Sequence, residues 1–189
     1  KTCGIIGLET MPEAPYNIGM YLKMGFILTP PTLLLAKSGL VPAKKTFNLA
    51  EASPEEVSEI SRKLLNGIDY GSEAENALKF GWGKPFSINK NGFCVLSVHN
   101  NAREPFLRVN AMGLTVSRKE DFVSGLRCLE NYALKNKAVR VVVSINSMHQ
   151  GALKLLLENG YKVKKCSVRM VKKGQYGKFQ AVDMSRWAM

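Results

Sequence analysis

The sequence contains one long internal repeat. When residues 1–39 are shifted by 135 positions, they align without a gap on residues 136–174. The shift places Gly25-Phe26 on Gly160-Tyr161 and Cys3 to Leu8 on Ala138 to Val143. A period of this length exceeds the roughly 20–50 residues of stacked repeat arrays, so it indicates duplication of a whole domain. The chain is therefore expected to build two related structural units.

The repeat divides the chain unequally. If a second copy spans about Pro54 to Met189, residues 1–39, here called the N-terminal segment, correspond only to the end of a first copy. Residues 40–52 hold Pro42 and Lys44-Lys45 without a hydrophobic period, which predicts a linker. Residues 53–189, here called the C-terminal unit, form the second domain. A first copy without its other strands has an exposed sheet edge, which favours association, including a homo-oligomer.

The N-terminal segment has the pattern of a strand, a helix and a second strand. Cys3 to Leu8 is small and apolar, Pro15 to Met24 is helical, and Phe26 to Lys37 is extended. Pro15 suits a first helical turn, and Gly25 suits the position just past a helix end.

Two capping boxes predict helix starts in the C-terminal unit: Ser53-Pro54-Glu55-Glu56 and Ser117-Arg118-Lys119-Glu120. The remaining predicted elements are strands at Phe93 to His99, Phe106 to Leu114, Val139 to Ile145, Tyr161 to Val171 and Phe179 to Met184, a turn around Asn100-Asn101, and a helix at Met148 to Glu158. This order predicts an α/β (mixed α+β) fold in which helices flank a central, mostly antiparallel sheet.

Composition narrows the class of protein. Hydrophobic residues make up 46 % of the chain and charged residues 22 %, which is typical of a soluble globular protein. No apolar run is long enough for a membrane-spanning helix and no signal-peptide pattern is present, so we expect a cytoplasmic protein without a membrane partner. The four cysteines are far apart and no histidine stands at ligand spacing, which predicts core thiols and no metal site.

One hexapeptide carries a family resemblance. Tyr21-Leu22-Lys23-Met24-Gly25-Phe26, preceded by a strand and a helix start, resembles the Tyr-x-Lys-x-Gly-Phe segment near the end of GNAT-superfamily acetyltransferases. The resemblance is weaker in the C-terminal unit, at Leu156 to Tyr161. It implies a GNAT-like fold, with acetyl-CoA held between two splayed parallel strands and its acetyl group transferred to an amine acceptor without a metal.

The resemblance also implies site residues. Tyr21 stands where the family often places the tyrosine that protonates the departing thiolate of coenzyme A. Its other interpretation is a core tyrosine beside Ile18 and Leu22. Asn17, one turn earlier, is a candidate for cofactor contacts, or else a capping or surface amide. Ala14 stands where the family often has asparagine, which weakens the transfer of cofactor contacts to this helix.

The C-terminal unit departs from the family at the phosphate-binding loop. The family has a Gln/Arg-x-x-Gly-x-Gly/Ala loop at a helix start, where free N–H groups attract the pyrophosphate. Here the junction reads Ser117 to Asp121, whose carboxylates repel a phosphate, while Arg118 and Lys119 favour one and are kept as cofactor-binding candidates. Leu156 replaces the tyrosine. The C-terminal unit is therefore predicted to be the non-catalytic half.

Two functions follow. The first is an acyl-CoA-dependent N-acetyltransferase, or the C-terminal part of one, which is inactive as this chain alone if its first copy is incomplete. The second is a non-catalytic GNAT-like binding module, because residues 136–189 carry eleven Lys or Arg against Glu158 and Asp183. Its basic surface would contact an acidic partner or nucleic acid through Lys162, Lys164, Lys165, Arg169, Lys172 and Lys173. No nucleic-acid-binding motif accompanies these residues, so nucleic acid ranks below acetyl-CoA as a partner.

Overall fold

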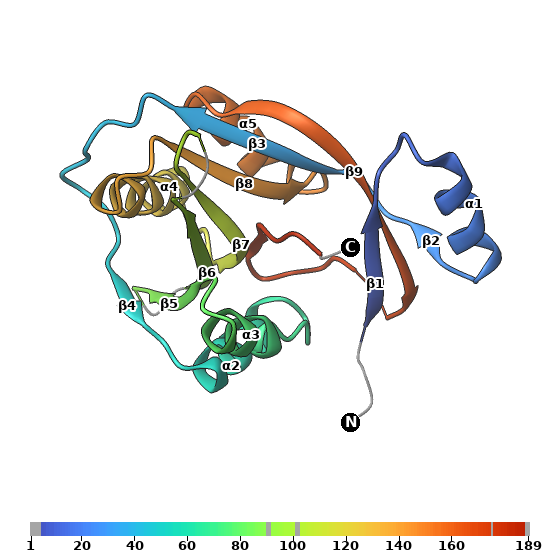
Figure 1. Ribbon diagram of the computed structural model, residues 1–189. Coiled ribbons are helices and arrows are strands. Elements are labelled where there is room, and N and C mark those ends of the chain that lie inside the picture. Colours follow the sequence, from blue (N-terminus) through green and yellow to red (C-terminus); the bar gives the residue numbers. More distant parts are fainter. Residues whose placement is uncertain (1–4, 90–91, 101–102, 175, 188–189) are drawn as a thin grey trace.

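The chain folds around one large sheet flanked by helices on both faces (Figure 1). The computed structural model describes residues 5–89, 92–100, 103–174 and 176–187. The strand order is β1-β9-β3-β8-β7-β6-β5-β4, while β2 pairs with β9 and β10 pairs with β7. Every strand pair is antiparallel except β7 with β8, so the predicted mixed, mostly antiparallel fold is confirmed.

The described elements have the following bounds. The strands are β1 (Ile6–Thr10), β2 (Ile27–Leu28), β3 (Thr32–Ser38), β4 (Leu49–Glu51), β5 (Lys84–Ile88), β6 (Gly92–His99), β7 (Phe106–Leu114), β8 (Arg140–Asn146), β9 (Lys162–Lys173) and β10 (Val182–Asp183). The helices are α1 (Pro15–Lys23), α2 (Pro54–Leu64), α3 (Gly71–Lys79), α4 (Lys119–Lys135) and α5 (Gln150–Glu158). Cys3 and Asn101, on which a strand and a turn were predicted, lie outside the described residues.

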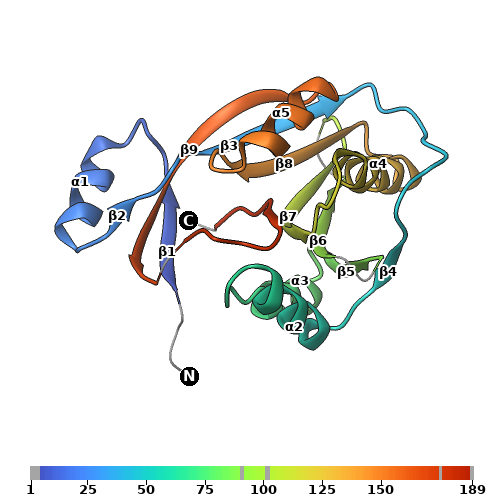
Figure 2. The ribbon, with the colours of Figure 1, turned by 180° about the vertical axis from the view of Figure 1, so that it is seen from behind.

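Two apolar cores fix the helices to the sheet. On one face, α4 and α5 pack on the sheet through a buried cluster that includes Phe122, Leu126 and Leu156. On the other face, α2 and α3 bury Val57 and Ala74 against the middle strands. Figure 2 shows the two helix pairs on opposite sides of the strands. Each Å² of apolar surface that is buried contributes about 25 cal/mol, so these two cores are the main source of stability.

Two sequence predictions need correction in the N-terminal half. The predicted extended run Phe26 to Lys37 is split into β2 and β3 by Pro30 and Pro31, because proline lacks the N–H that a strand ladder uses. The predicted linker, residues 40–52, ends in β4, which pairs with β5. The short elements β4, β5 and α3 were not predicted.

The two predicted helix starts have different outcomes. Ser53 caps α2 as predicted, since its side chain accepts a hydrogen bond of 3.2 Å from the Glu56 N–H. The second capping box lies one residue later than predicted. α4 begins at Lys119, and Asp121 Oδ2 accepts a hydrogen bond of 3.0 Å from the Arg118 N–H. Ser117 therefore lies outside the cap.

The N-terminal segment and the C-terminal unit exchange strands. β3 belongs to the N-terminal segment but lies between β8 and the first half of β9. The second half of β9 lies in turn between β1 and β2. Each part of the chain thus inserts one strand between two strands of the other, and Figure 1 shows β9 curving across both.

The registers of these strands follow the sequence repeat. Thr32 pairs with Ser167, and the two positions are 135 residues apart. Applying the same shift to the pairs of β9 with β1 gives pairs of β3 with β8. For example, Gly7↔Val171 and Leu8↔Met170 correspond to Ala36↔Val142 and Leu35↔Val143. The pairs of β1 with β9 and of β3 with β8 are therefore related by the 135-residue shift, which maps the Thr32–Ser167 pair onto itself.

Candidate functional site

Strands β7 and β8 form a splayed parallel pair. Their pairing covers only Phe106, Leu107 and Arg108 against Arg140, Val141 and Val142. β7 continues to Leu114 and β8 to Asn146, but without further pairing. The space between the strands beyond Arg108 is here called the wedge. Separated parallel strands expose backbone N–H and C=O groups, which must bond to another group.

The end of the chain fills this wedge. Residues 181–187, here called the tail, run antiparallel to β7, with β10 paired to Gly113 and Leu114. The Met184 N–H donates to the Met112 carbonyl at 2.8 Å, and the Arg186 N–H donates to the Asn110 carbonyl at 3.0 Å. β6 already occupies the other edge of β7 along its length, so the tail lies on the edge that faces β8.

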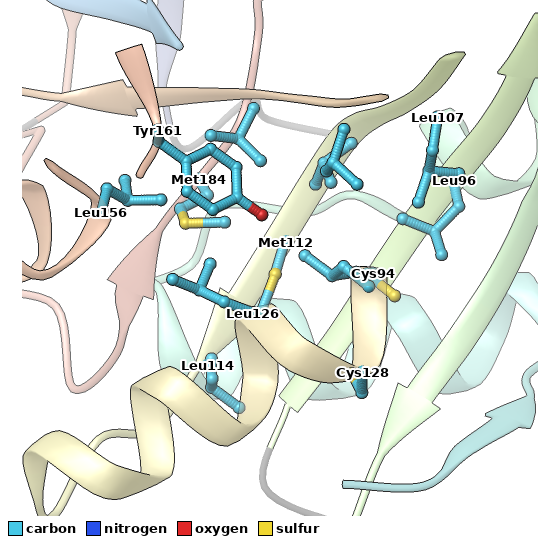
Figure 3. Packing of buried hydrophobic residues seen from close by; sticks show 14 of the residues in the cluster. Cys94, Leu96, Leu107, Met112, Leu114, Leu126, Cys128, Leu156, Tyr161 and Met184 are labelled. Carbon is cyan, nitrogen blue, oxygen red and sulfur yellow. The ribbon is translucent and has the colours of Figure 1, made fainter. Parts of the chain in front are cut away.

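Side chains of the tail complete both cores. Met184 is fully buried, and Figure 3 shows it beside Tyr161, Leu156 and Met112 in the cluster under α4. On the other face, Ala181 is buried with the α2 and α3 cluster. The tail is therefore part of the folded core.

A buried ionic cluster holds the tail in place. The side chain of Arg169 is completely buried, and its guanidinium contacts Glu9 Oε1 at 2.6 Å and Asp183 Oδ2 at 3.1 Å. It also donates to the Ser185 carbonyl at 2.7 Å. The guanidinium carbon lies 4.3 Å from the centre of the Trp187 ring. One arginine of β9 thus joins β1 to the tail.

The cluster favours the charged form of its arginine. Burial alone lowers the pKa of Arg169, but Tyr176, Asp183 and Glu9 outweigh it and raise the pKa above the usual range. Burial followed by the charge of Asp183 raises the pKa of the Tyr176 hydroxyl, which donates to Asp183 at 2.7 Å. Because Arg169, Glu9 and Asp183 are nearly inaccessible to solvent, this cluster binds the tail and not a substrate.

The structure separates the predicted site residues into two places. Tyr21 and Asn17 lie on α1, whereas Arg118 and Lys119 lie at the start of α4, and Figures 1 and 2 show these helices at opposite ends of the molecule. Tyr21 is half-buried with its ring edge-on to Phe26 at 5.7 Å, and Asn17 is exposed.

The start of α4 borders a cavity of about 290 Å³. Arg118, Lys119 and Lys154 line it together with Glu158, which lies 3.8 Å from Lys154, and with apolar side chains that include Val182 of the tail. Arg118 lies 3.5 Å from Asp121, so this carboxylate partly neutralises its charge at the helix cap. The cavity can therefore hold an anionic group beside Arg118 and Lys119, and it borders the tail at Val182.

A polar chain on β6 and β7 was missed by sequence reasoning. Asn110 Nδ2 donates to Ser97 Oγ at 3.0 Å, and Ser97 Oγ lies 3.1 Å from His99 Nε2. Burial, followed by the charge of Arg108, lowers the pKa of His99. The Ser-x-His spacing could have predicted this contact, because alternate residues of a strand lie on the same face.

His149 gives the tail a pH dependence. The Asp183 N–H donates to His149 Nε2 at 3.2 Å, which requires neutral imidazole. Burial lowers the pKa of His149 from its usual 6.5, opposed by Asp183 and assisted by Arg169. The unfolded state therefore binds a proton at higher pH than the folded state. The contribution of His149 to the free energy of unfolding is fully present above about pH 6.5. It decreases as the pH falls toward the lowered pKa, with a slope of at most about 1.4 kcal/mol per pH unit.

We expect this loss in urea unfolding between pH 7.5 and 5.5. His149→Gln should flatten the slope relative to the unsubstituted protein, because its side chain does not titrate. An equal slope in both proteins would show that His149 does not cause the effect.

Two further predictions are settled by burial. Arg169 was expected on a basic binding surface, but it is completely buried; the exposed cations of β9 are Lys162, Lys164, Lys165, Lys172 and Lys173. Cys94 and Cys128 are core thiols, and burial raises the pKa of Cys128 to about 12. Cys166 is only partly buried and borders a cavity.

Comparison with solved structures identifies the fold as that of the GCN5-related N-acetyltransferases (GNAT). The chain is similar to a putative acetyltransferase from Pyrococcus horikoshii, with a TM-score of 0.69 and 15 % identity over 98 % of this chain and 59 % of that one. It is also similar to GCN5-related N-acetyltransferases from Anabaena variabilis (TM-score 0.57, 12 % identity, 89 % and 45 % covered) and Sphaerobacter thermophilus (TM-score 0.53, 11 %, 93 % and 63 %).

The chain thus spans less than two thirds of the length of these three structures. No protein-family model matches the sequence, and no curated protein matches it. No helix among the described residues is long and apolar enough to cross a membrane, and no cluster of metal-binding side chains occurs among them.

Proposed function

We propose that the chain is the C-terminal part of an acetyl-CoA-dependent N-acetyltransferase built from two GNAT-like units. The observation that carries the proposal is the short parallel pairing of β7 and β8, which leaves a wedge of the kind in which this fold holds acetyl-CoA. The chemistry needs a group that takes a proton from the amine and a group that protonates the departing thiolate. The acceptor amine is left open.

The C-terminal unit is assigned a non-catalytic role. Its wedge is filled by the tail, whose backbone bonds to β7 where the cofactor would have to lie. Leu156, which is completely buried, replaces the tyrosine of the resembling segment. Arg118 and Lys119 would contact the phosphates of coenzyme A only outside the wedge, at the cavity that they line.

Catalysis is assigned to the first unit, of which the N-terminal segment forms the end. By the 135-residue shift, β1 and α1 correspond to β8 and α5. β1 is the last strand in the sheet order, and α1 buries no residue, whereas α5 buries Ala152 and Leu156. Exposed apolar side chains gather on this part: Tyr16, Met24, Ile27 and Leu28 are each at least half exposed.

Such a surface favours a covering partner. We propose that the strands and helices completing the first unit come from residues upstream in the same polypeptide, or from another copy of the protein. Tyr21 would then face the wedge formed by β1 and its new neighbour, and Asn17 would border the cofactor. The exposed lysines of β9 would support the binding of the anionic cofactor only by long-range electrostatic attraction.

The test is calorimetric titration of acetyl-CoA into this chain and into the chain extended by its natural upstream residues. We expect binding in the extended protein, with release of free thiol when an accepted amine is present, and no binding in the wedge of the short chain. Absence of binding and of acetyl transfer in both proteins contradicts the proposal. Binding to the short chain that Arg118→Gln with Lys119→Gln abolishes would instead place the cofactor at the C-terminal unit.

A further inference from the structure

A second cavity lies where β7 and β8 separate, on the face of the sheet that carries α2 and α3. Its volume is about 230 Å³, below the ~300 Å³ at which ordinary small-molecule pockets begin. It therefore suits a small ligand or the end group of a larger one. Its lining combines both halves of the molecule and the tail: Glu9, Met11, Leu34, Arg108, Ser144, Lys165, Cys166, Ser167 and Arg186.

Cations dominate this lining. Arg108, Lys165 and Arg186 all border the cavity, and none of them forms an ion pair with another described residue. Glu9 supplies the one carboxylate of the lining, but it is 4 % exposed and its Oε1 is bonded to Arg169. The excess positive charge is therefore not balanced within the cavity.

Of these three cations, Arg108 has a buried donor atom, its Nε, that lacks a hydrogen-bond partner among the described residues. Its guanidinium carbon lies 5.4 Å from the centre of the Phe106 ring, a contact that supplies no acceptor atom. Burial, followed by the charge of Arg186, lowers the pKa of Arg108. A half-buried guanidinium beside a second one is unfavourable unless an anion lies between them.

We propose that this cavity binds the carboxylate or phosphate group of a small acidic ligand, held between Arg108 and Arg186. Arginine suits such oxyanions because its planar fork donates two parallel hydrogen bonds. Lys165 adds a point charge, and the Ser144 hydroxyl supplies a neutral donor at the wall, whereas the Ser167 hydroxyl already donates to Glu9 Oε2 or to the Thr32 carbonyl, each at 3.4 Å. The cavity lies at the opening of the wedge, but the proposal concerns its own cationic lining and does not require acetyltransferase activity.

The first test is calorimetric titration of the protein with inorganic phosphate and, separately, with acetate, at constant ionic strength set by sodium chloride. We expect saturable binding of at least one probe. The probe that binds more tightly identifies the preferred oxyanion. Arg108→Gln and Arg186→Gln should each weaken binding about tenfold, since each removes a charge-assisted hydrogen bond. Lys164→Gln, an exposed neighbour of Lys165, should leave the affinity unchanged.

Absence of saturable binding of both probes overturns the proposal. Binding that survives Arg108→Gln and Arg186→Gln unchanged overturns it as well, because the anion then binds elsewhere. Arg186→Gln should also raise the unfolding temperature without added anion, since it removes the repulsion on Arg108, and should abolish the further rise caused by phosphate. A variant that merely damaged the fold would lower the temperature. None of these measurements involves coenzyme A, so failure here leaves the proposed function untouched.

Cys166 offers an independent, local probe. Its thiolate sulfur forms a bond to the CH₂ carbon of iodoacetate or iodoacetamide, and iodide leaves. In a Cys3→Ser background, in which Cys94 and Cys128 are buried, the two reagents report on the charge at Cys166. We expect the ratio of iodoacetate to iodoacetamide rates to fall about tenfold when both arginines become glutamine, because their field concentrates the carboxylate reagent. A ratio unchanged within about twofold would contradict the assignment.

Discussion

Replacing Arg169 by methionine is expected to lower the free energy of unfolding by about 3–5 kcal/mol, because two buried carboxylates lose the one cation that pairs with them among the described residues. Glu9 is 4 % exposed and Asp183 is fully buried, so water cannot solvate either charge in the folded state. The substitution also removes the bond from Arg169 to the Ser185 carbonyl, which helps to fix the tail. Urea unfolding followed by circular dichroism measures the change.

Lys164→Met is the matched control, since it removes a cation from the same strand at an exposed position. We expect it to change stability by less than about 0.5 kcal/mol. Adding Glu9→Gln and Asp183→Asn to Arg169→Met should recover part of the loss, because neutral amides are easier to bury than carboxylates. If Arg169→Met costs no more than Lys164→Met, the cluster does not stabilise the tail.

The second large effect concerns Tyr21 in the extended protein. Tyr21→Phe should reduce the rate of acetyl transfer by about 10²–10⁴-fold, the usual contribution of a general acid or base. Only the hydroxyl is removed, and the edge-on contact of the ring with Phe26 is kept. Acetyl-CoA affinity should therefore change little, and the loss should appear in kcat. Steady-state release of free thiol with an accepted amine is the measurement.

Tyr16→Phe is the control for Tyr21→Phe, because Tyr16 lies on the same helix and the substitution likewise removes only a hydroxyl. It should retain full activity. Equal rates for Tyr21→Phe and the unsubstituted protein would assign Tyr21 to packing, the other interpretation of its sequence pattern. A Tyr21→Phe protein that loses affinity for acetyl-CoA but keeps kcat would make Tyr21 a binding residue instead.

Sequence patterns predicted the elements that carry strong local signals. The Ser53 cap and the buried positions of α4 follow from helical periodicity and capping chemistry, which depend on neighbouring residues. β6 and β7 were predicted from their apolar runs. The shift of 135 residues predicted which positions of β3 and β9 correspond, and the strand registers follow that shift.

The rest depends on contacts between distant residues. No local pattern shows that β3 leaves its own segment to lie between β8 and β9, or that the tail enters the wedge. Arg169 resembles its lysine neighbours in sequence, and only the approach of Glu9 and Asp183 explains its burial. Arg108 of β7 and Arg186 of the tail likewise come to line the same cavity only in the folded chain.

The exchange of strands also limits how the molecule can move. Domain closure around a ligand usually occurs at a hinge, where a few residues change their backbone angles. Here β9 is hydrogen-bonded to strands of both halves, so a hinge between them would break sheet ladders on either side of the Thr32–Ser167 pair. Movements that keep the hydrogen bonds of β9 are therefore favoured over a hinge between the two parts.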